Sequence, residues 1–160
     1  MMGEKQRPDP VERLTVCLLM VNFKAMKAKR IDSASAAQVK RILVVEDEDN
    51  TRHALTKLLT REGFLVEGVS NGYEALCYLR RQPVHLIVTD IKMPRMDGIT
   101  FLKELNKSFP QSNVIMITAY GGVDSYLEAM NLGAFEYINK PVQIDELKMI
   151  MKKILDADGS

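Results

Sequence analysis

Four apolar segments of the chain are each followed by polar residues that are suited to bind a cation or a phosphate. The segments span residues 41–45, 84–89, 113–117 and 135–138. The polar residues that follow them are Glu46, Asp47, Asp90, Thr118 and Lys140. These carboxylates, the hydroxyl and the ammonium group would form one site if the ends of the segments met in space.

Glu46, Asp47 and Asp90 would bring three carboxylates together at such a site. Close carboxylates disfavour one another's charged form unless a positive charge compensates. A divalent cation provides that charge, and Mg²⁺ is usually held by one or two carboxylates, waters and phosphate oxygens. The neighbouring Glu48 and Asp49 are explained equally well as solvated residues of a loop and a helix start.

Asp90 is a candidate nucleophile, because a carboxylate can attack phosphorus and form a covalent aspartyl phosphate. In phosphoryl transfer the protein contributes mainly positioning and electrostatic stabilisation. Lys140 would supply a mobile positive charge, and Thr118 would donate its hydroxyl to a phosphate oxygen. Taken singly, each is explained as well by a surface lysine or a strand-end residue, but their joint placement favours a site.

Alternating strand and helix patterns must position these residues. Apolar and β-branched runs predict strands at 41–45, 64–69, 84–89, 113–117 and 135–138. Helical apolar spacing predicts helices at 51–62, 98–109, 123–132 and 144–155, and a further one capped by Asn71. The first helix is expected to have Asp49 or Asn50 as its cap and Gly63 as its stop, and Gly133 is expected to end the fourth.

The expected fold class is α/β, a flavodoxin-like three-layer sandwich. Strands alternating with helices imply right-handed βαβ units and a parallel sheet. The predicted sheet has five strands in the order 2-1-3-4-5, with five helices. Connections from strands one and three leave in opposite directions in this order, which opens a crevice at the carboxyl ends of the strands. The polar residues should gather there.

Residues 1–38 are expected to form a basic helical extension and linker, outside a domain at 39–156 and a tail at 157–160. Residues 1–41 hold nine Lys/Arg and four Asp/Glu, a net charge of +5, whereas residues 42–160 hold thirteen and seventeen, a net charge of −4. Such asymmetry indicates two regions with different roles. An upstream helix or tail without chemical importance, a dimerising arm and a membrane-surface arm all remain open.

Cysteine content and hydropathy indicate the compartment. Cys17 and Cys77 show neither metal-ligand spacing nor a disulfide framework, which favours a reducing cytoplasm. The apolar run at 16–21 is too short to span a bilayer, and acidic residues before it argue against a signal peptide. A cytoplasmic protein without a membrane span is therefore expected.

Four motifs resemble those of receiver domains in the response regulators of two-component signal transduction, with their chemotaxis-regulator-like fold. Residues 42–48 look like the opening strand of that family. Residues 89–98 resemble its D-x-x-M-P-x-M-D-G phosphoacceptor loop, and residues 115–120 resemble the strand that bears the switch hydroxyl. Residues 133–141 resemble its G-A-x-x-Y-x-x-K-P segment. The resemblance covers residues 39–156.

The resemblance implies that Asp90 is the phosphoacceptor. It implies that Mg²⁺ (or Mn²⁺) is bound by Asp47, Asp90 and the backbone carbonyl of Lys92, with Glu46 as the other member of the acidic pair. An aspartate is more usual at the position of Glu46, so the metal affinity is expected to differ.

The resemblance also implies a switch pair, Thr118 and Tyr137. Phosphorylation would draw Thr118 inward, and Tyr137 would rotate into the space that Thr118 leaves. Lys140 would contact the phosphate, and its bond to Pro141 is expected to be cis, which would aim Lys140 at the site. Val142 stands where an aromatic residue is common, a departure that concerns the output face.

Two residues near Asp90 are expected to tune the lifetime of its phosphate. Lys92 lies two residues past the phosphoacceptor, and Tyr120 lies two residues past Thr118. Both side chains could shield the acyl phosphate from water, which predicts slow autodephosphorylation. The chain is thus expected to be a phosphoacceptor regulator rather than an enzyme acting on other molecules.

The implied partner is a sensor histidine kinase or a histidine phosphotransfer protein, which would contact residues 50–62. Phosphorylation would change the face formed by the fourth helix (123–132), the fifth strand (135–138) and the fifth helix (144–155). That face would control a partner, an output domain or a homodimer, and no direct nucleic-acid binding by the receiver is expected. Its candidate lining residues are Met130, Leu132, Ile144 and Met149.

Three other functions are less consistent with the residues. A flavodoxin that binds FMN needs a phosphate cradle after the first strand, where this chain has four acids in a row. A phosphatase with an aspartate nucleophile needs a second acid two residues further on, where this chain has Lys92. A receiver-like interaction module that is not regulated by phosphorylation usually lacks a key residue, and it remains the main alternative.

Overall fold

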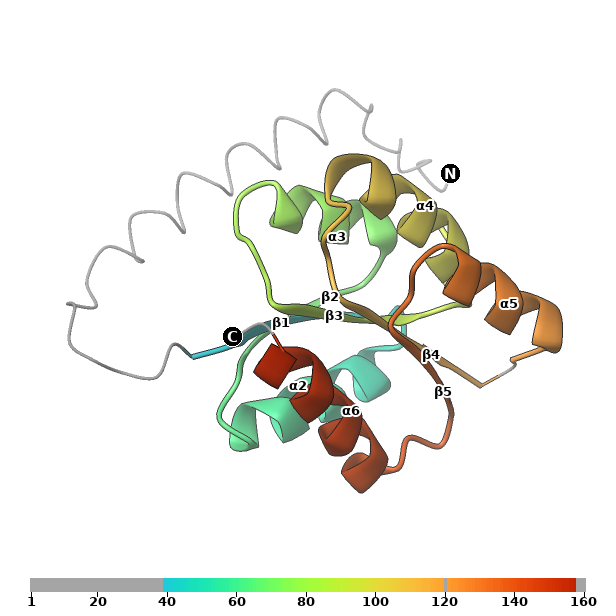
Figure 1. Ribbon diagram of the computed structural model, residues 1–160. Coiled ribbons are helices and arrows are strands. Elements are labelled where there is room, and N and C mark those ends of the chain that lie inside the picture. Colours follow the sequence, from blue (N-terminus) through green and yellow to red (C-terminus); the bar gives the residue numbers. More distant parts are fainter. Residues whose placement is uncertain (1–38, 120, 158–160) are drawn as a thin grey trace, which may run out of the picture. The chain divides into compact units, whose positions relative to one another are not determined.

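The computed structural model describes residues 39–119 and 121–157, which form five strands and five helices in alternation (Figure 1). The elements are β1 (Arg41–Val45), α2 (Asp49–Arg61), β2 (Leu65–Val69), α3 (Gly72–Leu79), β3 (Leu86–Asp90), α4 (Gly98–Ser108), β4 (Val114–Thr118), α5 (Val123–Asn131), β5 (Glu136–Asn139) and α6 (Ile144–Ala157). The predicted extension at 1–38, Tyr120 and residues 158–160 lie outside the described residues.

The five strands form one parallel sheet in the order β2-β1-β3-β4-β5. This confirms the predicted flavodoxin-like order. In the register of the sheet, Val45 lies opposite Thr89, and Asp90 lies opposite Ile117. The carboxyl ends of β1, β3 and β4 are therefore level with one another, which places the residues that follow them at one edge.

Helices cover both faces of the sheet, with α3, α4 and α5 on one side and α2 and α6 on the other (Figure 1). Successive strand residues point to opposite faces. Leu43 and Ile87 accordingly pack beneath α3, α4 and α5, whereas Ile42 and Val88 pack against α2 and α6. This double burial explains why the strands read as nearly unbroken apolar runs.

The first helix begins earlier than predicted. Its N-cap is Glu48, not Asp49 or Asn50, because Glu48 is the last residue with extended backbone (φ −80°, ψ 117°). The Glu48 side chain caps no backbone N–H, and its carboxylate accepts a hydrogen bond from the Thr51 hydroxyl instead.

The third strand lies later than predicted, at Leu86–Asp90 rather than 84–89. His85 precedes the strand, where its N–H donates to the carbonyl of Arg41 and its Nδ1 accepts the N–H of Arg41. Asp90 is thus the last residue of β3, held in the sheet rather than in the loop after it.

The other elements lie within one or two residues of the predictions. Gly63 (φ +94°) follows α2 and Gly133 (φ +88°) follows α5. This left-handed conformation is the usual end of a helix, and it costs glycine little. Among residues 39–119 and 121–157, no helix is long and apolar enough to cross a membrane.

Candidate functional site

Glu46, Asp47 and Asp90 meet at the carboxyl ends of β1 and β3. One carboxylate oxygen from each lies within 4.8 Å of the others. Glu46 is 3% exposed and Asp90 is 8% exposed, whereas Asp47 is exposed. The neighbouring strands therefore create a cluster of two buried carboxylates and one that faces solvent.

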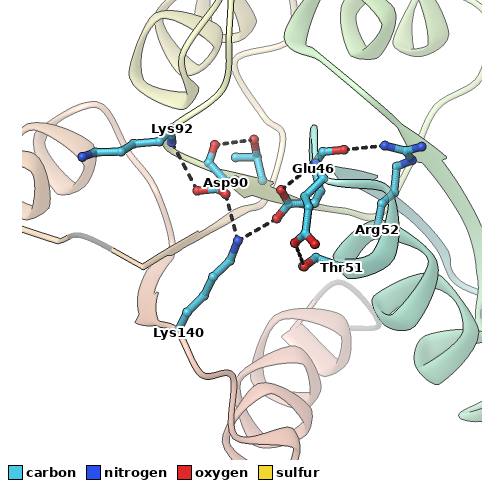
Figure 2. Close-up of polar contacts among 8 residues, drawn as sticks. Glu46, Thr51, Arg52, Asp90, Lys92 and Lys140 are labelled. Carbon is cyan, nitrogen blue, oxygen red and sulfur yellow. Dashed lines mark hydrogen bonds and ion pairs between the residues drawn. The ribbon is translucent and has the colours of Figure 1, made fainter.

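The side chain of Lys140 reaches between two of these acids (Figure 2). Its Nζ lies 2.8 Å from Glu46 Oε2 and 2.9 Å from Asp90 Oδ2. Lys140 directly follows β5, and its backbone N–H donates to the carbonyl of Thr118 over 2.7 Å. The Lys140–Pro141 peptide bond is cis. The ammonium group is thus the counter-charge of the acidic cluster.

For both Glu46 and Lys140, burial shifts the pKa in one direction and hydrogen bonding shifts it in the other. Burial raises the pKa of the Glu46 carboxyl, and hydrogen bonds from Lys140 and from the Glu48 N–H lower it only in part. Burial alone would lower the pKa of Lys140, but its hydrogen bonds to Glu46 and Asp90 outweigh that effect and raise it. Lys140 therefore keeps its positive charge at neutral pH.

Both oxygens of the Asp90 side chain have hydrogen-bond partners (Figure 2). Oδ2 faces Lys140, and Oδ1 accepts the backbone N–H of Lys92 over 3.2 Å. The Thr89 hydroxyl donates to the Asp90 carbonyl. The side chain of Lys92 itself is exposed. These contacts fix the orientation of the carboxylate while leaving it near the surface.

The loop after Asp90 is anchored by buried apolar residues and a glycine. Ile91, Met93 and Met96 are all buried. The N–H of Gly98 donates to the Ile91 carbonyl over 2.7 Å, and a Cβ at Gly98 would lie 2.3 Å from the Asp90 carbonyl oxygen. Sequence analysis assigned no role to Gly98, although its place after an aspartate at a helix start was a usable signal.

Arg52 contacts the acidic cluster on the side of α2, and the sequence analysis did not identify it. Its guanidinium donates to the Glu46 carbonyl over 2.9 Å (Figure 2). It also pairs with the Asp49 carboxylate. The Glu48 N–H donates to Glu46 Oε1 over 3.2 Å. These bonds hold the turn between β1 and α2, and with it the buried Glu46 carboxylate.

Thr118 and Tyr137 lie on the neighbouring strands β4 and β5. Thr118 is fully buried and lies opposite Asn139 in the sheet. The Tyr137 ring packs edge-on against Tyr126 of α5, with ring centroids 5.5 Å apart. Burial raises the pKa of Tyr137. The predicted rate-tuning residue Tyr120 lies outside the described residues.

The side chains expected to line the output face divide into two pairs. Met130 and Leu132 are partly buried against the core beneath α3, α4 and α5, so core packing explains them. Ile144 and Met149 of α6 are 45% and 55% exposed. Apolar residues repeated every three or four positions identify an apolar side of a helix, but they do not show whether that side packs on the core or faces solvent.

The oxygen donors fit a hard divalent cation. Mg²⁺ prefers carboxylate, carbonyl and water oxygens, and it keeps several of its waters. Glu46, Asp47 and Asp90 supply carboxylate oxygens within reach of one ion, and the exposure of Asp47 leaves a side open to a hydrated ion. Nitrogen and sulfur ligands, which softer metals prefer, are absent from this described cluster.

A family model and sequence relatives among known proteins match this chain over most of its length. A family model described as the response regulator receiver domain matches residues 42–152. The regulatory protein AtoC of Escherichia coli is 39% identical over 121 residues, which are 76% of this chain and 26% of AtoC. Sporulation initiation phosphotransferase F of Bacillus subtilis is 36% identical over 115 residues, which are 72% of this chain and 93% of that protein.

Solved structures share the architecture. A response regulator receiver domain protein from Clostridium thermocellum matches with a TM-score of 0.72 and 31% identity, over 76% of this chain and 98% of that one. The response regulator TrrA from Thermotoga maritima, in complex with Mg²⁺ and BeF, matches with a TM-score of 0.67 and 37% identity, over 72% of this chain and 99% of that one.

The fold and the site define a class of protein, an α/β domain with an acidic cluster and a lysine at the carboxyl ends of its strands. The chain belongs to the response regulator receiver domain family of two-component phosphorelays. Receiver domains act as phosphorylation switches and phosphoacceptors. The chain spans about a quarter of the length of AtoC and of NtrC from Proteus hauseri (26% and 24%).

Proposed function

We propose that Asp90 accepts a phosphoryl group and that its phosphorylation switches this domain between two conformations. The observation that carries the proposal is the position of Lys140 Nζ, 2.9 Å from Asp90 Oδ2 and 2.8 Å from Glu46 Oε2. A positive charge fixed beside the nucleophile stabilises the negative charge of a transferring phosphoryl group. Asp90 is buried, with 8% of its surface exposed, and it lies beside the exposed Asp47 at the edge of the sheet.

In the proposed step a carboxylate oxygen of Asp90 attacks the phosphorus of a phosphohistidine. An oxygen–phosphorus bond forms, the phosphorus–nitrogen bond breaks, and its electron pair returns to the imidazole nitrogen of the donor. The contacts from Lys140 and from the Lys92 N–H orient the carboxylate for this attack. Mg²⁺ bound by Asp47, Asp90 and the Lys92 carbonyl, beside Glu46, would offset the negative charge of the phosphoryl oxygens.

The conformational response would pass from β4 to β5. The Thr118 hydroxyl would bond a phosphate oxygen, and Tyr137 would occupy the space that Thr118 leaves. The two strands are hydrogen-bonded neighbours, and the Lys140 N–H donates to the Thr118 carbonyl, so a shift at Thr118 has a direct route to β5. The face of α5, β5 and α6 would then change its affinity for an output partner or for a second copy of the chain.

The proposed partners are a sensor histidine kinase or a histidine phosphotransfer protein that contacts α2 and its adjoining loops in the cytoplasm. We further propose that Lys92 and Tyr120 slow the hydrolysis of the aspartyl phosphate. Replacement of both by alanine should shorten the phosphate lifetime, measured by mass spectrometry after removal of the donor. An unchanged lifetime would exclude this shielding role.

Incubation with acetyl phosphate and Mg²⁺, followed by intact-mass measurement, tests the central proposal. The chain should gain one phosphoryl group, and Asp90→Asn should gain none. Asp97→Asn is the matched control, because Asp97 lies exposed on the same loop and caps α4 through the Thr100 N–H, which asparagine can also do. No adduct on the wild type, or an equal adduct on Asp90→Asn, would exclude Asp90 as the phosphoacceptor.

A further inference from the structure

The ring of Tyr137 is held by packing rather than by a hydrogen bond of its hydroxyl group. It packs against Tyr126 with the ring planes at 83°. Its hydroxyl oxygen is buried and has no hydrogen-bond partner among the described residues. A hydroxyl buried in this way is unfavourable unless packing compensates. The neighbours of the ring must therefore fit it closely.

Gly121, at the start of the segment leading into α5, provides that fit. A Cβ atom there would lie 2.4 Å from Tyr137 Oη, 2.8 Å from Tyr137 Cε1 and 2.9 Å from Asn139 Oδ1. These distances are well below the roughly 3.5–4.0 Å of a favourable carbon contact. The positive φ angles among the described glycines belong to Gly63 and Gly133, so backbone strain does not require a glycine at position 121. What matters there is the space left for the tyrosine.

The buried hydroxyl identifies the position of the ring. Tyr137 lies on β5, the edge strand of the sheet, where an outward ring would place its hydroxyl in solvent. Its hydroxyl is instead buried next to the space where a Cβ of residue 121 would lie, and we call this position inward. An atom at the tip of a ring moves easily when the side chain rotates, so added bulk at position 121 should displace the tyrosine rather than unfold the sheet.

We propose that the absence of a side chain at Gly121 makes room for the inward Tyr137 ring and that Tyr126 packs against its side. These two residues would then set how readily the domain adopts the phosphorylated conformation. This inference rests on the proposed switch function of Asp90, Thr118 and Tyr137. If the bound phosphate and the inward ring favour the same state, each stabilises the other by the same factor. A substitution that keeps the ring out of the inward position must therefore weaken the binding of a phosphate analogue by that factor.

The test compares Gly121→Ala with Gly122→Ala in the full chain. Gly122 is the matched control, because a Cβ atom there would meet nothing within 4 Å. Tyr126→Ala removes the ring that packs against Tyr137 and is the second variant; since Tyr126 is 42% exposed, its truncation should leave the core intact. Fluorine NMR of fluorotyrosine-labelled protein reports the position of Tyr137, whose resonance is assigned by its loss in Tyr137→Phe. Calorimetric titration measures the affinity for beryllofluoride with Mg²⁺, and for Mg²⁺ alone.

Gly121→Ala should move the Tyr137 resonance toward that of an exposed tyrosine and weaken beryllofluoride binding about fivefold or more, the lower end of usual allosteric couplings. Mg²⁺ affinity should not change, and Gly122→Ala should resemble the wild type. Tyr126→Ala should act in the same direction to a smaller extent. If Gly121→Ala behaves like Gly122→Ala, or moves the ring without changing beryllofluoride affinity, the proposal is wrong.

Circular dichroism checks that each variant is folded. If Gly121→Ala is not folded, Tyr126→Ala decides, and an unchanged resonance together with an unchanged affinity overturns the proposal. A wild-type chain that binds no beryllofluoride and accepts no phosphoryl group would instead overturn the proposed function. The NMR comparison would still show in that case whether Gly121 makes room for the inward Tyr137 ring.

Discussion

Lys140 neutralises two carboxylates that come from different strands of the sheet. Glu46 is almost completely buried, and burial raises its pKa, so its ionised form depends on the nearby ammonium group. A buried charge that loses its partner is far more costly than an exposed one. The contribution of Lys140 should therefore extend beyond phosphate chemistry to the stability of the domain without phosphate.

Replacement of Lys140 by methionine should separate these contributions. The free energy of unfolding in urea should fall by about 1–3 kcal/mol, the usual cost of a buried polar group left without its partner. Mg²⁺ affinity should rise, because a competing positive charge is removed from the three acids. Phosphorylation by acetyl phosphate should slow by about a hundredfold, as when a preorganised donor to a transition-state oxygen is removed.

Lys148→Met is the matched control for this prediction. Lys148 also pairs with a glutamate, Glu62, but the pair lies on the surface. Exposed ion pairs contribute about 0–1 kcal/mol, so this variant should keep its stability, metal affinity and phosphorylation rate. Equal behaviour of the two variants would show that Lys140 is only another surface lysine.

The sequence identifies the acids and the lysine but not how they pair. Glu46 and Lys140 are 94 positions apart, and their contact depends on the final position of β5 at the edge of the sheet. The closeness of Gly121 to Tyr137 is also a property of the folded state, because two segments must first pack before the missing Cβ has any effect. Residue types and strand ends are local in the sequence, whereas side-chain partners are not.

At the level of elements, the connection from β3 to α4 determines where Asp90 lies. Gly98 is the first residue of α4, and its missing side chain lets the helix approach the end of the strand. A Cβ atom there would lie 2.3 Å from the Asp90 carbonyl oxygen and 2.8 Å from the Ile91 Cα. Both neighbours are backbone atoms, so a side-chain rotation cannot relieve the overlap.

Gly98→Ala should therefore destabilise the domain even though alanine favours helices. The intrinsic gain from replacing glycine in a helix is roughly 0.5–1 kcal/mol. Overpacking against backbone costs typically 1–3 kcal/mol, so the net change should be a loss of stability in urea unfolding. The phosphorylation rate should also fall, because the Asp90 backbone must move. Greater stability than in the wild type would show that the loop yields easily.

The elements were the most predictable level of the structure. Strand and helix types follow from apolar period and caps, and the strand order was predicted from the alternation of five strands with five helices, which is typical of a flavodoxin-like sheet. The errors lie at ends, where local rules compete. Glu48 takes the cap position although Asp49 and Asn50 are better capping residues, because the chain leaves the extended conformation only after Glu48.

At the level of the whole molecule, the described residues 39–119 and 121–157 contain two apolar clusters and the acidic site. The two apolar clusters, one on each face of the sheet, contain buried side chains of β1, β3, β4 and β5 and of all five helices described, and the partly buried Val66 and Val69 of β2 pack against them. Leu147, Ile150 and Met151 of α6 belong to the second cluster, so the last helix is an integral part of the fold. The acidic cluster and Lys140 also lie inside this range.

We propose that residues 1–38 form a separate region, and two truncations test this proposal. A chain that starts at residue 39 should keep its melting temperature within about 4 °C, a shift that corresponds to roughly 1 kcal/mol for a domain of this size. It should also be phosphorylated by acetyl phosphate at the wild-type rate. A chain that ends at residue 143 should not fold, because it lacks the buried side chains of α6. Thermal melts by circular dichroism and intact-mass measurements check both, and an unfolded or unreactive 39–160 chain would place the basic N-terminal segment within the folding unit.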